Sequence, residues 1–89
     1  MAKGALLKIS GQAQGVGLRY AVYQYAQLNQ LRGWIRNEPD STVDCFLQNS
    51  EAEIKGFLGW LKKEFSNIER IDLNWQETNA DFDNFIVKY

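Results

Sequence analysis

Histidine is absent from the 89 residues of this chain, and cysteine and proline occur once each, as Cys45 and Pro39. Without histidine and with a single thiol, the chain lacks the usual zinc ligand sets. The same absence excludes every nucleophile that histidine would activate, and it removes the side chain best suited to acid–base catalysis near neutral pH. A single cysteine also excludes a disulfide within the chain. These absences narrow the possible chemistry before any motif is considered.

Long apolar runs are also missing. The amino-terminal stretch MAKGALLKIS has too short an apolar core for a signal peptide, and no stretch approaches the length of a membrane span. We therefore expect a protein of the reducing cytoplasm. Hydrophobic residues make up 45% of the chain and charged residues 24%, which is typical of a globular domain rather than a disordered one. This length supports one modest core, so we expect a single domain over residues 1–89.

Charge is unevenly distributed, although the net charge is only −1. All eleven acidic residues lie in residues 38–89, whereas five of the ten basic residues lie in residues 1–37. The overall balance is not that of a nucleic-acid-binding protein. The electropositive first half suits a small anionic ligand, although random scatter of charge in a short chain explains it equally well.

The periodicity of apolar residues predicts strands and helices in a regular order. Alternation predicts strands over residues 5–10, 31–37, 42–48, 68–75 and, more briefly, 82–89. Helical spacing predicts one helix over residues 16–30 and a second that Ser50 and Glu53 open with a capping box. The turn NEPDST, residues 37–42, should join the second and third strands into an antiparallel hairpin.

The resulting order is βαββαβ with an additional terminal strand, whose position in the sheet remains open. Such an order indicates an α+β, ferredoxin-like two-layer sandwich, with two helices packed on one face of an antiparallel or mixed sheet. In this split βαβ arrangement the two central strands lie side by side, and the end of the first strand lies near the end of the second. We therefore expect the stretch GQAQGVGLRY, residues 11–20, to lie near Asn37.

This stretch holds Gly11, Gly15 and Gly17 between a predicted strand and a predicted helix. Glycines in such a loop let backbone N–H groups surround an anion, and the helix dipole adds to the attraction. The spacing matches neither the dinucleotide-binding nor the Walker motif, and most glycine clusters before a helix are simply turns. Arg19 favours the anion, because a cation in the first helical turn is disfavoured by about 0.3–1 kcal/mol unless a bound dianion reverses the sign.

Asn37 is the second unusual residue, since asparagine is a poor strand residue and this one ends the second strand on the face of Ile35. Its amide offers both a donor and an acceptor, which suits holding a water molecule in one orientation. A simple role in starting the turn is an equally good interpretation.

GQAQGVGLRY, followed after a short helix by LRGWIRNEPD, closely resembles the acylphosphatases. That family has a G-x-V-Q-G-V-G-F-R loop, then a G-x-V-x-N strand end and an acidic hairpin turn. The resemblance covers essentially the whole chain, although its specific motifs lie in the first half. It implies a small hydrolase that converts acyl phosphates to a carboxylate and inorganic phosphate without a metal, a cofactor or a covalent intermediate. We expect it to be cytoplasmic and monomeric.

By match to that motif, backbone N–H groups of the loop would hold the phosphoryl group, and the Arg19 guanidinium would bind its oxygens. The loop residues implied are Gln14, Gly15, Val16, Gly17, Leu18 and Arg19. Asn37 would position the attacking water, and a phosphate oxygen of the substrate would act as the base. Inorganic phosphate, the product, would also inhibit.

The chain departs from the family pattern at a few positions. Leu18 and Ala13 replace a phenylalanine and a valine, which should alter packing only slightly. Ser41 stands where the family usually has glycine in the hairpin turn, so the turn could change shape and displace Asn37. FSNIE replaces a Gly-Pro after the second helix. We expect these changes to affect the rate more than the activity itself.

Two other functions remain open. The sandwich could bind an anion without turnover, like the phosphate-binding domain that begins hydrogenase-maturation carbamoyl-transfer proteins. It could also be an RNA-recognition sheet, with Trp34 and Phe46 stacking bases on the open face, although the chain lacks the aromatic-rich strands of that class. A partial apolar cover explains those aromatics more simply.

Overall fold

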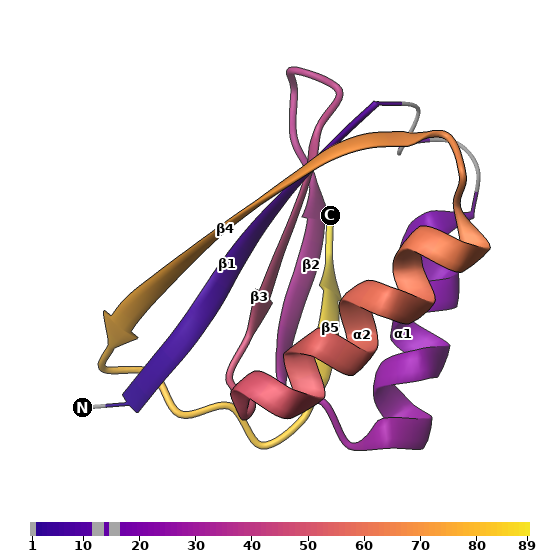
Figure 1. Cartoon of the computed structure of the whole chain (residues 1–89). Helices are drawn as coiled ribbons and strands as arrows, with labels where there is room; N and C mark the ends of the chain where they lie inside the picture. Colours follow the sequence, from indigo (N-terminus) through magenta and orange to yellow (C-terminus); the bar gives the residue numbers. More distant parts are fainter. Residues whose placement is uncertain (1, 12–13, 15–16) are drawn as a thin grey trace.

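A sheet on one side and helices on the other form the two layers of the computed structural model (Figure 1). The structure describes residues 2–11, 14 and 17–89. Within these residues, two helices and five strands follow one another: β1 (Ala2–Gly11), α1 (Leu18–Asn29), β2 (Gly33–Asn37), β3 (Val43–Leu47), α2 (Glu51–Glu64), β4 (Ile68–Thr78) and β5 (Phe85–Lys88). The predicted element order and the ferredoxin-like α+β class are confirmed.

The strands lie in the order β4-β1-β3-β2-β5. β3 runs antiparallel to both of its neighbours, which confirms the predicted β2–β3 hairpin. The terminal strand β5 pairs in parallel with β2, so it occupies the edge opposite β4. In Figure 1 the segment that follows β4 runs along the lower end of the sheet to reach this edge. This placement brings the end of the chain alongside α1.

Several element boundaries differ from those predicted. β1 begins at Ala2 and β4 continues to Thr78, because these two strands pair along their whole length, from Ala2 opposite Thr78 to Gly11 opposite Ile68. α1 spans Leu18–Asn29 rather than residues 16–30, because left-handed backbone conformations flank it at Gly17 and Gln30. The periodicity of apolar residues predicts neither how far two strands pair across a sheet nor which residues adopt a left-handed conformation at a helix end.

The core lies between the sheet and the helices. Apolar side chains of alternate strand positions face the helices and are at most 3% exposed: Ala5, Leu7, Ile9, Ile35, Val43, Cys45, Leu47 and Phe85. The helices contribute Leu18, Val22, Ala26, Ile54, Phe57 and Leu61. Burial raises the pKa of the Cys45 thiol well above its ordinary value, so this cysteine is a core residue rather than a nucleophile. None of the helices in the described residues combines the length and apolarity needed to cross a membrane.

The opposite face of the sheet carries the row of aromatics that the sequence placed there. Trp34 stacks on Phe46 with ring centroids 6.1 Å apart, and Phe82 tilts against Phe46 at 5.7 Å. Phe46 is only 5% exposed, so its ring does not offer a platform for a nucleotide base. The Lys88 ammonium lies 4.5 Å from the Trp34 ring centroid, which covers part of that ring as well. These residues form the partial apolar cover of the sheet.

α2 begins as predicted and ends differently from the family pattern. Ser50 and Glu53 form the complete capping box, and the hydrogen bond from Ser50 lowers the pKa of the Glu53 carboxyl. At the other end the Phe65 N–H donates to the Leu61 carbonyl at 3.0 Å, and the Phe65 ring packs edge-on against Trp60. The chain thus leaves α2 through an aromatic contact in place of a Gly-Pro turn.

The β2–β3 hairpin keeps a glycine-like turn although it has Ser41. The Glu38 N–H donates to the Thr42 carbonyl at 2.8 Å, and the Ser41 N–H donates to the Glu38 carbonyl at 3.2 Å. Ser41 adopts a left-handed φ of 72°, the conformation for which the third residue of such a loop favours glycine. The turn therefore keeps its shape, and Asn37 stays in register opposite Val43.

We expect the substitution Ser41→Gly to stabilise the protein. A left-handed conformation costs about 1–2 kcal/mol in a residue with a Cβ, and the greater unfolded-state freedom of glycine offsets part of this gain. Urea denaturation should show a free energy of unfolding higher by about 0.5–1 kcal/mol. Ser66→Gly, at an exposed serine without a positive φ, is the control and should bring no gain. If both substitutions changed the free energy of unfolding equally, the backbone at Ser41 would not be strained.

Candidate functional site

The two strand ends next to the predicted site residues lie at the same end of the sheet. Val43 pairs with Ile9 on one side and with Asn37 on the other, so the end of β1 and the end of β2 flank the start of β3. Neighbouring strands lie about 4.8 Å apart, which puts Ile9 and Asn37 about 10 Å from each other. The loop between β1 and α1 begins here, as the sequence predicted. Gly15 and Val16 of the predicted phosphate-binding set lie outside the described residues, as does Ala13.

The first turn of α1 lies at this end of the sheet, and its first backbone N–H groups have no hydrogen-bond acceptor among the described residues. Gly17 is the N-cap, with φ 77°, and no side chain of the described residues caps the helix. The first hydrogen bond of the helix runs from the Ala21 N–H to the Gly17 carbonyl at 3.1 Å. The N–H groups of Leu18, Arg19 and Tyr20 therefore have no acceptor within the helix. An uncapped helix N-terminus without an acidic residue in its first turn is a favourable place for an anion.

Leu18 holds this helix end in place. Its side chain is only 2% exposed and belongs to the core cluster, although its backbone N–H lies at the uncapped end. In the part of the chain that the structure describes, nothing lies within 4 Å of the position that a Cβ of Gly17 would occupy. Its φ, not crowding, therefore explains why a glycine precedes the helix.

Arg19 lies between the helix N-terminus and the end of the chain. Its Nη1 donates to the Lys88 carbonyl at 3.4 Å, and its Cζ lies 4.9 Å from the centroid of the Tyr89 ring. No carboxylate among the described residues lies within 4.0 Å of this guanidinium. Its positive charge thus adds to the helix dipole without local compensation. The sequence could not place Lys88 and Tyr89 beside Arg19, because the position of β5 was not predictable.

Asn37 presents a buried acceptor. Its Oδ1 is buried and has no hydrogen-bond partner in the part of the chain that the structure describes. Leaving a buried polar group unpaired costs about 1–3 kcal/mol, so such an atom is expected to have a partner from solvent or ligand. The face that Asn37 shares with Ile35 is the helix side of the sheet, where α1 also lies. A donor such as water would satisfy it.

Gln14 connects the loop to the hairpin turn. Its Nε2 donates to the Glu38 carbonyl and to the Thr42 carbonyl, each at 2.8 Å. These two residues close the hairpin directly after Asn37, so one side chain links the loop before α1 to the strand end that carries Asn37. The sequence assigned Gln14 only to the backbone cradle. Its side-chain role has no signature in the sequence, because its partners are main-chain atoms.

The carboxylates of the hairpin are poorly suited to act as a general base. Glu38 Oε2 accepts from Arg36 Nε at 2.7 Å. Asp40 accepts from the hydroxyl and the N–H of Thr42, and these hydrogen bonds lower the pKa of the Asp40 carboxyl below its ordinary value. A depressed pKa makes a carboxylate a weaker proton acceptor near neutral pH. Within the described residues no three side chains of cysteine, aspartate or glutamate gather closely enough to hold a metal ion.

Comparisons with known proteins agree on one family. The family model described as acylphosphatase matches residues 5–87. An acylphosphatase of Thermococcus kodakarensis is 31% identical over 75 residues, which cover 82% of each chain. The crystal structure of an acylphosphatase from Bacillus subtilis superposes with a TM-score of 0.87 at 26% identity, covering 98% of this chain and 99% of that one. HypF of T. kodakarensis superposes with a TM-score of 0.86 at 28% identity, over 98% of this chain and 12% of the HypF chain.

We expect Gln14→Ala to loosen the link between the loop and the hairpin. Loss of two hydrogen bonds should lower the free energy of unfolding by about 1–2 kcal/mol. It should also reduce the rise in melting temperature that added inorganic phosphate produces, since a less ordered loop binds an anion less tightly. Gln76→Ala, at an exposed position of β4, is the matched control. A phosphate-induced rise equal to that of the wild type would contradict this role.

Proposed function

This chain belongs to the acylphosphatase family, enzymes whose general reaction is the hydrolysis of acyl phosphates, and we propose the mechanism by which its own residues carry out that reaction. The observation that carries the proposal is the uncompensated Arg19 at the uncapped N-terminus of α1, on the side of the sheet where the unpartnered Oδ1 of Asn37 lies. The first group attracts a phosphoryl dianion and the second orients a water molecule.

Binding of the phosphoryl group comes first. Arg19 donates to its oxygens, and the backbone N–H groups of Gly17, Leu18 and Arg19 join this interaction, together with those of Gln14, Gly15 and Val16 by match to the family motif. Charge-assisted hydrogen bonds from a guanidinium and a helix N-terminus strengthen as charge develops on the phosphoryl oxygens. Phosphoryl transfer depends mostly on positioning and charge stabilisation, which is what these groups provide.

Asn37 positions the nucleophile. Its Oδ1 accepts a hydrogen bond from the attacking water, whose oxygen forms the new bond to phosphorus. The bond from phosphorus to the acyl oxygen breaks in line, and its electron pair leaves with the carboxylate. The water proton passes to a phosphoryl oxygen of the substrate itself. The weak basicity of the hairpin carboxylates and the absence of histidine support this substrate-assisted route. A carboxylate leaves without a proton, so no general acid is needed.

A second candidate function is phosphate binding without turnover. It is favoured by the superposition of 98% of this chain on only 12% of HypF, where the same fold is part of a much longer protein. Enzymatic assay separates the two functions, because both use the same anion site and only one releases product.

The assay uses benzoyl phosphate at neutral pH, without added metal and with EDTA present. We expect hydrolysis above the spontaneous rate, insensitivity to EDTA and competitive inhibition by inorganic phosphate. Phosphate that binds while benzoyl phosphate stays intact would favour the binding module. Activity lost in EDTA and restored by a divalent cation would contradict the metal-free reaction.

The roles of Arg19 and Asn37 predict different kinetic effects. Arg19→Ala should raise KM for benzoyl phosphate and weaken phosphate inhibition, because it removes the main charge of the anion site. Asn37→Ala should mainly lower kcat, by about 10²–10³-fold, because it removes the group that orients the water. Arg70→Ala and Asn74→Ala, at exposed positions of β4, are the matched controls and should behave as wild type. The reverse pattern would contradict the assignment of roles.

A further inference from the structure

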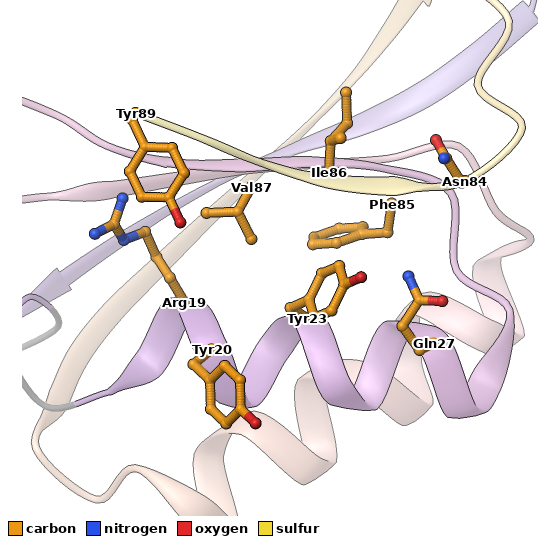
Figure 2. Close-up of a pocket in the computed structure, with 9 residues that line it drawn as sticks. All are labelled: Arg19, Tyr20, Tyr23, Gln27, Asn84, Phe85, Ile86, Val87 and Tyr89. Atoms are coloured by element: carbon orange, nitrogen blue, oxygen red, sulfur yellow. The ribbon is translucent and has the colours of Figure 1, made fainter.

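A groove runs along the surface between α1 and the edge strand β5, starting at Arg19 (Figure 2). Its volume is about 560 Å³. Figure 2 shows Arg19, Tyr23 and Gln27 projecting from α1 toward β5, in that order along the helix. These residues are four apart, so they lie on one face of the helix and span about 12 Å from the first to the third.

β5 lines the opposite side in the reverse direction. Tyr89 lies beside Arg19 at one end of the groove, and Asn84 lies beyond Phe85, on the side of Gln27, at the other (Figure 2). Phe85 and Val87 lie between these two ends, opposite Tyr23. The guanidinium proposed to bind the phosphoryl group therefore stands at the mouth of a groove that leads away from it.

The lining of the groove is apolar and almost uncharged. Phe85 is buried and Tyr23 is 37% exposed, so apolar surface of the Tyr23 ring faces solvent here, whereas the Ile86 side chain points away from α1 (Figure 2). Arg19 is the one charged side chain among its lining residues in the described chain. The amides of Gln27 and Asn84 also border an adjoining hollow of about 430 Å³, so this end of the groove is open. An uncharged, apolar group that is several atoms long fits this chemistry, because among the described residues the charged side chains beyond Arg19, Arg32 and Asp83, line only the adjoining hollow.

We propose that this groove binds the acyl group of the substrate, and that the enzyme prefers acyl phosphates whose acyl part is an uncharged aromatic ring or apolar chain. The proposal rests on the proposed function, because the phosphoryl group at Arg19 fixes where the acyl group begins. An acetyl group is too short to lie along the groove. A benzoyl group is longer and would extend along the groove toward Tyr23, which lies one helical turn from Arg19.

The test compares two substrates in the same variants. In Tyr23→Ala the ratio of kcat/KM for benzoyl phosphate to that for acetyl phosphate should fall about five- to tenfold, because one face of the acyl ring loses its apolar contact. Tyr23→Phe keeps the ring and should keep the wild-type ratio. Leu28→Ala, at a position of α1 that is 85% exposed and does not line the groove, should also keep it.

Failure of this inference is distinct from failure of the proposed function. If both substrates are hydrolysed and Tyr23→Ala leaves the ratio unchanged, the acyl site is wrong and the hydrolase stands. If wild-type protein hydrolyses neither substrate, the proposed function is wrong. The acyl site is then tested by calorimetry with the non-hydrolysable benzoylphosphonate and acetylphosphonate. A ratio of dissociation constants that Tyr23→Ala does not change would overturn the inference there too.

Discussion

The pairing of β3 with both β1 and β2 is the constraint on which the site depends. Val43 is opposite both Ile9 and Asn37. The start of the short strand β3 therefore holds two distant chain segments at the same end of the sheet. A slip of one residue in either pairing would turn the face of every side chain, because side chains alternate across a strand. The buried Val43, Cys45 and Leu47 oppose such a slip, since it would expose all three. The apolar core thus sets the distance between the anion site and Asn37.

Near the ends of these strands, several polar groups have no protein partner among the described residues, and a bound ligand would supply one. The helix N-terminus has no cap, Arg19 has no carboxylate beside it within the described residues, and Asn37 holds a buried acceptor. The other helix, α2, follows the ordinary rules, as its complete capping box and its basic last turn show. The contrast between the two helices within one small domain supports a functional explanation for α1. The hydrogen bonds and charge interactions that these groups do not form in the free protein can form with a ligand. Their free energy then contributes to binding and to stabilising the transition state.

Much of the fold followed from local pattern. Alternation and helical spacing predicted the order of the elements, the hairpin and the start of α2, because each depends on neighbours within a few residues. The extent of β1 and β4 was underestimated, since the added residues Ala2 to Gly4 and Gln76 to Thr78 become strand only by pairing with each other. Ser41 left open a change in the shape of its turn, and the hydrogen bonds of Glu38, Asp40 and Thr42 hold it in the left-handed conformation. Tertiary context overrode the preference of a single residue.

By itself the sequence determined the family, the α+β class and the pair of residues, Arg19 and Asn37, on which the chemistry is proposed to depend. These follow from residue types and spacings, which a chain displays before it folds. The tertiary structure alone decided that the Gln14 side chain links the loop to the hairpin, and that β5 lies beside α1 with Lys88 and Tyr89 at Arg19. It also decided that a groove extends from Arg19. These contacts involve main-chain atoms and apolar surfaces, and one of them joins residues 69 positions apart in the chain. Contacts of this kind leave no periodic or compositional signal in the sequence.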